Sequence, residues 1–430
     1  MSSNEESPNV PTGNKGEWGE VYAFFRLLSK PLLRQCDENL RTVTEDVGEG
    51  SDEIGIVYFN QILRRPHKDQ PPLCYILDED NNQWRVTSNG ISKVVSSVDC
   101  DKQAKKLLRD IHGWGKGRTK HFPDAYDFLV NQLLATSIKA KSEDKQDIEL
   151  TIKEKISGSF MRCGFSIKSL FGSKPTLLNP SRPTCFTYKI SGIDIETANE
   201  IQGYSVSTIE YKPVPKGWIP SIVYRIQEKG GALALYSMHE TFEKNMEFID
   251  TKMAQMISYY VLEAYAKKPS ATMGRGSSRR IKAMTRRISK SNPLGFSERN
   301  KDLLYEYKIK RFLEAVALGL TPSTEWCGEE DASGGYIIVK SNGELVAFLI
   351  YDRAQLLSYL FNNTQLEHPS FSRLNEHKEE DTGAELGTEK KKKKKEKKEE
   401  EKAPSTPIGR IFEKNGNLFI TLPLQIRFTL

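Results

Sequence analysis

The 430-residue sequence lacks several features that would narrow its class at once. Its six cysteines are scattered without a paired CxxC spacing, which argues against a disulfide framework or a zinc knuckle. No apolar run approaches the roughly 20 residues of a membrane-spanning helix. The N-terminus is polar and has no apolar stretch of the secretory type. These absences lead us to expect a protein of the reducing cytoplasm, without a membrane partner.

A strong overall charge is also missing, because most of the formal net charge of +6 comes from one tract. Residues 389–402 contain nine lysines and five glutamates, so they supply +4 and leave +2 for the rest of the chain. The overall charge is therefore poor evidence for a nucleic-acid partner, and local charge has to make that case. The length allows one large hydrophobic core or two ordinary ones.

Composition shifts divide the chain into ordered and disordered parts. Residues 1–14 are polar and predict a disordered N-terminal tail. Residues 374–407 include six consecutive lysines and predict a charged low-complexity insert. Between these parts, residues 15–373 alternate between helical and strand-like periodicity, and strands resume at residues 408–430. The ordered chain is thus expected to mix helices with β-strands.

Local periodicity predicts the individual elements. Helical spacing indicates a first helix from Lys15 that ends before Pro31, with Glu17 and Glu20 in its opening turns. Acids suit the positive end of a helix dipole, which alone would account for both. Further helices are expected at residues 101–111, 124–134, 248–261, 278–290, 300–318 and 354–361, and strands within residues 54–98, 148–152, 164–168, 185–190, 334–351 and 408–430.

An acid and a lysine mark the stretch from Asp147 to Lys168. Asp147 precedes one apolar alternation and Lys168 lies inside the next, so a hairpin would place both at one end of adjacent strands. A carboxylate there could hold a divalent metal, and the metal and lysine together would favour hydroxide beside a scissile phosphate. Two exposed charges on strand edges would have the same spacing, so the spacing alone does not decide.

A basic segment runs from Ala264 to Ser297, with nine lysines and arginines and no acid. A helix at residues 278–290 would bury a narrow apolar stripe and turn its cationic side chains outward. A solvated face is one interpretation. We favour a surface for the DNA backbone, because cations that neutralise phosphates release counterions. The candidate residues on this surface are Arg279, Arg280, Arg286 and Arg287.

Several long stretches of the sequence resemble the HpaII family of type II restriction endonucleases. They follow one another along most of the chain: Asn14–Leu28, Ser137–Ile152, Gly164–Tyr188, Gly334–Tyr351, Leu360–Arg373 and Leu422–Phe428. That family is similar to the PD-(D/E)xK nucleases, whose core is a mixed sheet flanked by helices. The resemblance implies an α/β (α+β mixed) fold, with a catalytic core at about residues 15–190, DNA-binding elements at about 191–373 and C-terminal strands that complete the fold.

The resemblance also implies roles for the hairpin residues. In such nucleases the site uses an Asp, a second acid, a Lys and Mg²⁺. By position, Asp147 corresponds to the metal-binding aspartate, and Lys168 to the lysine that orients or deprotonates the attacking water. The backbone carbonyl of Ile167 would be a further metal ligand. The acid expected two residues before the lysine is missing, because Ser166 occupies that position.

The replacement for the missing acid is expected on the first helix. The sequence KGEWGE at residues 15–20 resembles the KGxxxE pattern of related nucleases, which implies Glu20 as a metal ligand and catalytic acid. Glu17 and Glu149 are the alternatives. Ser166 also leaves open a DNA-binding protein that kept the fold and lost catalysis, and a repair or structure-specific nuclease is a third hypothesis.

The family acts on short palindromes in double-stranded DNA, and its named member cuts within CCGG. The resemblance therefore implies such a target, a homodimer on DNA and a partner methyltransferase. Guanine recognition favours a bidentate arginine in the major groove. Besides the basic segment, the candidate DNA contacts, each of which could equally cap a helix or a turn, are Lys139, Lys141, Asn179, Arg182, Arg353, Asn362, Asn363 and Arg373.

Overall fold

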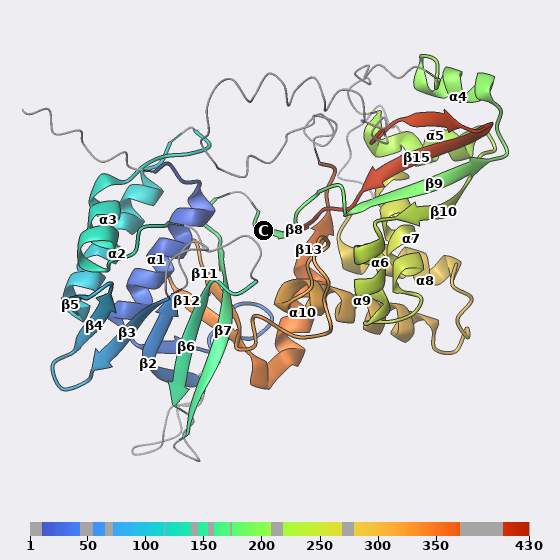
Figure 1. The fold of residues 1–430 in the computed structure, drawn as a ribbon. Helices are drawn as coiled ribbons and strands as arrows, with labels where there is room; N and C mark the ends of the chain where they lie inside the picture. Colours follow the sequence, from blue (N-terminus) through green and yellow to red (C-terminus); the bar gives the residue numbers. More distant parts are fainter. Residues whose placement is uncertain are drawn as a thin grey trace, which may run out of the picture.

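The structure is a computed structural model that describes residues 11–43, 55–64, 72–115, 117–138, 145–153, 159–172, 174–207, 218–268, 279–369 and 407–429. The candidates Lys139, Lys141 and Arg373 lie outside these residues, as does the predicted insert up to residue 406. The described chain forms a mixed α/β fold with three sheets (Figure 1). The expected fold class is thereby confirmed. Within the described residues, no helix is both long and apolar enough to cross a membrane.

Most of the expected elements are present. The helix expected from residue 248 begins later, at Met253, and the helix expected at 124–134 is a short α-helix followed by a π-helical turn, Phe128–Gln132. The helices are α1 (Lys15–Ser29), α2 (Ser97–His112), α3 (Pro123–Asp127), α4 (Ile195–Gln202), α5 (Ile222–Glu228), α6 (Glu240–Glu247), α7 (Met253–Tyr265), α8 (Ile281–Ser291), α9 (Lys301–Leu318) and α10 (Arg353–Asn363).

The strands build the three sheets that Figure 1 shows. They are β1 (Leu32–Arg34), β2 (Ile56–Arg64), β3 (Leu73–Asp78), β4 (Gln83–Ser88), β5 (Ile91–Ser96), β6 (Ile148–Lys153), β7 (Phe160–Ser169), β8 (Thr176–Leu178), β9 (Cys185–Ser191), β10 (Ala232–Met238), β11 (Gly335–Val339), β12 (Leu345–Leu349), β13 (Thr364–Leu366), β14 (Ile411–Lys414), β15 (Asn417–Pro423) and β16 (Ile426–Phe428).

The largest sheet has nine strands, in the order β12-β11-β7-β6-β2-β3-β4-β5 with β1 against β2. The predicted hairpin is its centre: β6 and β7 pair antiparallel, with Ile148 opposite Phe165. On the other side β7 pairs parallel with β11. The predicted division at residue 190 therefore needs correction, because β11 and β12 belong to this sheet. Every residue of β11 is buried, and such a strand needs cover on both faces.

Strand β11 joins two hydrophobic cores, because its side chains alternate between the faces of the sheet. Ile337 and Val339 belong to the core that includes α1 and the first face of the sheet. Tyr336 and Ile338 belong to a second core, which includes α7 and α9. In register, Tyr336 lies beside Ser166 and Ile338 beside Lys168. The candidate lysine is thus on the sheet face that points toward the second core.

Helix α1 packs closely on β7. Its first turn is closed by a capping box between Asn14 and Glu17, as the sequence pattern favours. The ordered chain begins before the expected boundary at residue 14, because Gly13 exchanges two backbone hydrogen bonds of 2.9 Å with Lys120. Gly19 faces Ser169 so closely that an added Cβ would overlap its side chain. This approach brings Glu20, the residue after Gly19, close to the hairpin that contains Asp147 and Lys168.

The C-terminal strands complete the two smaller sheets. One has the order β10-β9-β15-β14 and the other β13-β16-β8. The turn between β14 and β15 has φ of 52° at Asn415 and 74° at Gly416, as in a type I′ hairpin turn, which an Asn-Gly pair favours. Figure 1 shows the three-stranded sheet between the two larger ones. Residues far apart in the sequence therefore meet in the small sheet.

The close contact between α1 and β7 generates a stability prediction. Gly19→Ala should lower the free energy of unfolding by about 1–3 kcal/mol, because overpacking forces the helix away from the strand. Ser169→Gly in the same chain should recover part of the loss. Denaturant unfolding of the two single variants and the double variant measures the coupling. Gly115→Ala is the control, because an added Cβ there meets nothing within 4 Å. Full stability of Gly19→Ala would contradict the close approach.

Candidate active site

The carboxylate of Asp147 is fixed by the strand beside it. The backbone N–H of Asp147 donates to the carbonyl of Phe165 at 2.8 Å, just before β6 begins. Asp147 Oδ2 then accepts from the N–H of Ile167 at 2.6 Å and from Ser166 Oγ at 3.2 Å. The serine that replaces the expected acid thus orients the aspartate. One Asp147 oxygen is held by two donors, so the position of the carboxylate is set by the hairpin itself.

Lys168 lies beside Asp147, as the hairpin pattern predicts. Its Nζ is 4.0 Å from Asp147 Oδ2, and the two side chains are 23% and 15% exposed. The ammonium group also lies 5.7 Å from the centre of the Tyr336 ring. Burial alone would disfavour the charge, but Asp147, Tyr336 and Glu20 outweigh burial and raise the pKa of the ammonium group. In this site the lysine is a positive charge rather than a neutral base.

Glu20 brings a second acid to this place from α1. Its side chain is half-buried. Burial raises the pKa of the Glu20 carboxyl well above its usual value, and the neighbouring charge of Asp147 raises it further. The positive charges of Lys168 and Arg64 act in the opposite direction. Glu20 therefore lies within the electrostatic field of both hairpin residues, which is the position that a replacement for the missing acid requires.

The two alternative acids are engaged elsewhere. Glu17 Oε2 accepts the backbone N–H of Asn14 at 2.8 Å and closes the capping box of α1. Glu149 lies on β6 and accepts from Arg162 Nε at 3.0 Å, on the adjacent strand. Both carboxylates already serve local structure. The geometry therefore favours Glu20 over Glu17 and Glu149.

Two basic residues near the site had no signal in the sequence. Arg64, at the end of β2, is buried and contributes to the field at both Glu20 and Asp147. Burial lowers the pKa of Lys145 to about 8, and the charge of Lys168 lowers it further, against Asp331 and Asp147. In the sequence, Lys145 is a single cation before a predicted strand, and Arg64 is a single cation at the end of another. Lys145 is only two residues before Asp147, whereas the pairing of β2 with β6 is what brings Arg64 near Asp147.

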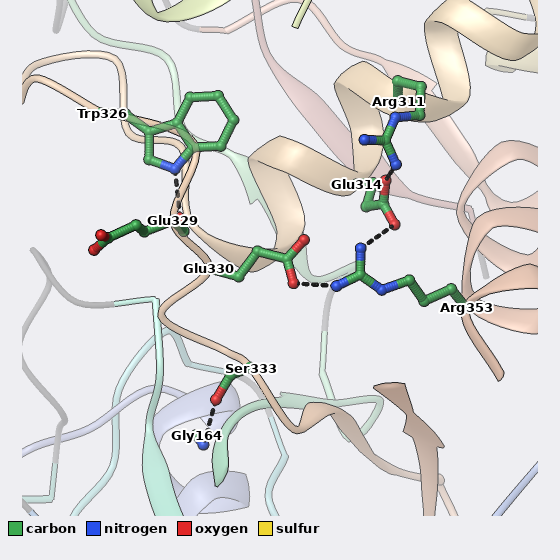
Figure 2. Close-up of polar contacts among 8 residues, drawn as sticks. All are labelled: Gly164, Arg311, Glu314, Trp326, Glu329, Glu330, Ser333 and Arg353. Atoms are coloured by element: carbon green, nitrogen blue, oxygen red, sulfur yellow. Dashed lines mark hydrogen bonds and ion pairs between the residues drawn. The ribbon is translucent and has the colours of Figure 1, made fainter. Parts of the chain in front are cut away.

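The loop before β11 is hydrogen-bonded to the hairpin, and Figure 2 shows the bond between Ser333 and Gly164. The N–H of Gly164 donates to Ser333 Oγ at 3.2 Å, and the N–H of Gly334 donates to the carbonyl of Gly164 at 2.7 Å. The same loop contains Glu330, which pairs with Arg353. The guanidinium of Arg353 also reaches Glu314 at 3.5 Å. This pairing favours a structural role for Arg353 over the predicted DNA contact.

Several candidate DNA contacts gather around the three-stranded sheet. Asn179 and Arg182 are exposed and follow β8. Asn362 and Asn363 end α10, just before β13, where Asn362 Oδ1 accepts from Lys282 Nζ at 2.7 Å and Asn363 donates to the carbonyl of Tyr359. These residues are far apart along the chain. The pairing of β13, β16 and β8 brings them to one region.

Arg279 and Arg280 reach the same region from the start of α8. The backbone of Arg280 bridges to Gln365 in β13. Arg279 donates to His368 Nδ1 at 2.7 Å, while His368 Nε2 donates to the carbonyl of Ala264 at 2.9 Å. Burial and then the charge of Arg279 lower the pKa of His368 to about 4, which keeps the ring neutral and able to accept. The guanidinium of Arg279 is thus held in place.

The rest of α8 has the predicted two-faced pattern. Ile281, Met284 and Ile288 are buried, which confirms the apolar stripe. Arg286 is exposed on the opposite side. Arg287 Nε pairs with Glu263 at 2.5 Å, so its charge is partly neutralised within the protein. Of these two arginines, Arg286 is the better placed for a DNA phosphate.

The donor set at the site suits a hard cation. Among the described residues, no group of three or more Asp, Glu, His and Cys side chains could hold a metal ion. Asp147 and Glu20 supply two carboxylates, and the backbone carbonyl of Ile167 on β7 is a further oxygen. Mg²⁺ prefers oxygen ligands and keeps several waters, so two carboxylates are enough protein side chains. Burial, and after it the charge of Asp147, raise the pKa of the Glu20 carboxyl, and a bound cation would offset both effects.

The chain is similar to one known family and to one curated relative. The family model described as HpaII restriction endonuclease matches residues 14–380. A curated relative, the type II restriction enzyme HpaII of Haemophilus parainfluenzae, is 31% identical over 421 residues, which cover 97% of this chain and 98% of the relative. No solved structure matches the chain.

The half-buried pair of Glu20 and Asp147 generates a prediction for the protein without bound metal. A group whose folded-state pKa is raised stabilises the fold at low pH, and this contribution is lost as the pH rises through that value. Glu20→Gln keeps the shape without the charge. At pH 8 the metal-free variant should therefore melt higher than the unchanged protein, on the order of 2 °C or more, and the difference should shrink toward pH 5.

Thermal melting with and without Mg²⁺ at both pH values measures this effect. Added Mg²⁺ should stabilise the unchanged protein and have less effect on Glu20→Gln, because the variant has lost a carboxylate. The matched control is Glu17→Gln on the same helix, since glutamine also serves in a capping box. Equal responses of the two variants would exclude Glu20 as a metal ligand.

Proposed function

Since the chain belongs to the HpaII restriction endonuclease family and is thus a type II site-specific deoxyribonuclease, we propose that it hydrolyses double-stranded DNA at a short palindrome in a Mg²⁺-dependent reaction. CCGG is the candidate target, and the products would carry 5′-phosphate and 3′-hydroxyl ends. The observation that carries the proposal is that Glu20 of α1 lies in the electrostatic field of Asp147 and Lys168, which are 4.0 Å apart. An acid from the first helix supplies what the hairpin lacks.

The side chains have distinct roles in this proposal. Asp147 and Glu20 are the metal-binding carboxylates, and Ser166 and the N–H of Ile167 orient Asp147. The Lys168 ammonium stabilises the negative charge that develops on the phosphate and orients the attacking water. Type II restriction enzymes generally use divalent metal ions, and a bound Mg²⁺ supplies a Lewis acid that makes water a stronger nucleophile.

Two observations favour an active nuclease over a DNA-binding protein that lost catalysis. The departure at Ser166 was the main argument for lost catalysis, yet Ser166 donates to Asp147 and supports its orientation. Glu20 lies close enough to Asp147 for the aspartate to raise its pKa. The second carboxylate is therefore present, although it comes from another element.

DNA binding in this proposal uses the region around α8 and the three-stranded sheet. Arg286 is exposed on α8, and Asn179 and Arg182 are exposed after β8. A two-fold palindrome would be bound by two copies of the chain related by the same symmetry. A methyltransferase of the same specificity would protect the DNA of the producing cell.

A cleavage assay tests the proposed reaction. The protein with unmethylated plasmid and Mg²⁺ should give discrete fragments whose ends lie at CCGG, and a chelator should stop the reaction. Lys168→Ala should cleave more slowly by about 10²-fold or more, because a positive charge at the phosphate is lost. Lys189→Ala, an exposed lysine on β9, is the matched control and should cleave normally.

The same assay separates the competing hypotheses. Binding of the plasmid without any cleavage would favour the inactive DNA-binding protein. Cleavage of branched DNA alone would favour the structure-specific nuclease. Discrete fragments whose ends lie at another sequence would keep the nuclease and reject CCGG.

The salt dependence of DNA binding tests the two kinds of arginine. Arg286→Ala should lower the slope of log K against log salt concentration by about 1, because one phosphate contact is lost. Arg353→Ala should leave the slope unchanged and lower the melting temperature, since Glu314, only 4% exposed, loses a partner. Binding to a nonspecific duplex without metal measures both. If Arg353→Ala lowered the slope and Arg286→Ala did not, Arg353 rather than Arg286 would contact a DNA phosphate.

A further inference from the structure

Two motifs of the sequence, TQLEH at residues 364–368 and QIRF at residues 425–428, pair with each other in the three-stranded sheet. Gln365 of β13 lies opposite Arg427 of β16, and Thr176 of β8 lies on the other side of Arg427. The flanking residues Leu366 and Ile426 are buried. The regular pairing of β13 with β16 puts Gln365 and Arg427 on one face of the sheet, and Thr176 lies beside Arg427 across an irregularity in the pairing of β16 with β8. Together the three residues form a row of polar residues across the sheet.

The donors of Arg427 are incompletely satisfied. Its NH1 is 4.0 Å from Glu367 Oε2, which is too long for a hydrogen bond. The other oxygen of Glu367 already accepts from Gln365 Nε2 at 2.5 Å. Among the described residues, Arg427 Nε is buried without a hydrogen-bond partner. The guanidinium is therefore incompletely paired within the described protein, and because the side chain is 27% exposed, its terminal nitrogens can bond to an acceptor from outside.

The surroundings of Arg427 are those of a DNA-binding region. The backbone of the neighbouring β13 is tied to α8, because the N–H of Leu366 donates to the carbonyl of Arg279 at 3.0 Å. The guanidinium of Arg279 is held by His368 just after this strand. The Arg427 side chain is 27% exposed, and its NH1 lies 4.0 Å from Glu367 Oε2. The row thus combines a cation near a carboxylate with partial access to a ligand.

The row also lies near the candidate catalytic lysine. Only eight residues separate Lys168 from Thr176, so the two are no more than about 29 Å apart even if the chain were fully extended. That span corresponds to about eight base pairs of DNA. Figure 1 shows the small sheet between the sheet of the catalytic hairpin and the four-stranded sheet. Base pairs close to the cut bond are therefore within reach of the small sheet.

We propose that Arg427 is a specificity-determining residue that binds the edge of a guanine in the target site, and that Glu367 positions its guanidinium. The inference rests on the proposed function, because it assumes site-specific cleavage. Guanine presents two acceptors in the major groove, O6 and N7, which match the fork of an arginine. A lysine in the same place would keep the charge but not the fork.

The test compares Arg427→Lys with the unchanged protein on a set of short duplexes. One duplex contains the site found at the ends of the plasmid fragments, and each of the others differs from it by one symmetric pair of base substitutions. For Arg427→Lys, the preference for the correct base pair should fall about tenfold or more at one G·C position and stay unchanged at the others. Arg85→Lys, an exposed arginine on β4, is the control and should keep every preference.

Each other outcome overturns the inference. An unchanged preference at all positions would show that Arg427 contacts a phosphate or only the protein. A uniform loss of activity with a lower melting temperature would show a structural role. Absence of site-specific cleavage by the unchanged protein would reject the proposed function as well, which distinguishes the two failures.

A second variant keeps the test usable if Arg427→Lys folds poorly. Glu367→Gln keeps the hydrogen bond partner of Gln365 and removes the charge that faces Arg427. This variant should relax the preference at the same G·C position, by a smaller factor, and leave the salt dependence of nonspecific binding unchanged. Relaxation at a different position, or none, would reject the positioning role of Glu367.

Discussion

The close packing of α1 on β7 is the constraint on which the candidate site depends. Gly19 lies so near Ser169 that no side chain fits between the helix and the strand. One residue later, Glu20 enters the field of Asp147 and Lys168. The hairpin contributes one carboxylate and one lysine, and the helix contributes the other carboxylate. The candidate site therefore combines residues of two elements, which approach at a distance that only glycine allows.

The second organising feature is β11, which connects the catalytic hairpin to the rest of the molecule. Its parallel pairing with β7 places residues 335–339 beside the candidate lysine. Its alternating side chains belong to both hydrophobic cores. The loop before it holds Gly164 of the hairpin and, through Glu330, the arginine that begins α10. The helices near the DNA-binding region are thus joined to the catalytic strand by a continuous set of contacts.

The arginines show why charge alone does not identify a DNA contact. Arg353 and Arg287 are paired with carboxylates of the protein, whereas Arg286 is exposed on the same helix as Arg287. Arg427 stood in a motif that the sequence had singled out, but its donors became informative only when β16 was seen beside β13. An arginine in the sequence has the same charge in all these cases. Its partners, which lie far away along the chain, decide its role.

The sequence by itself determined the local elements and the family. Asn14 and Glu17 start α1, Pro31 follows its end, and the apolar alternation after Asp147 produces the hairpin with Lys168 in place. These follow from short-range rules of capping and side-chain periodicity. The resemblance to the KGxxxE pattern already implied Glu20 as the acid that accompanies Asp147. The tertiary structure adds a physical reason for this candidate, because Glu17 and Glu149 serve local contacts and Glu20 lies in the field of Asp147. It also decided that β11 belongs to the catalytic sheet, because strand pairing depends on long-range burial that no local pattern specifies.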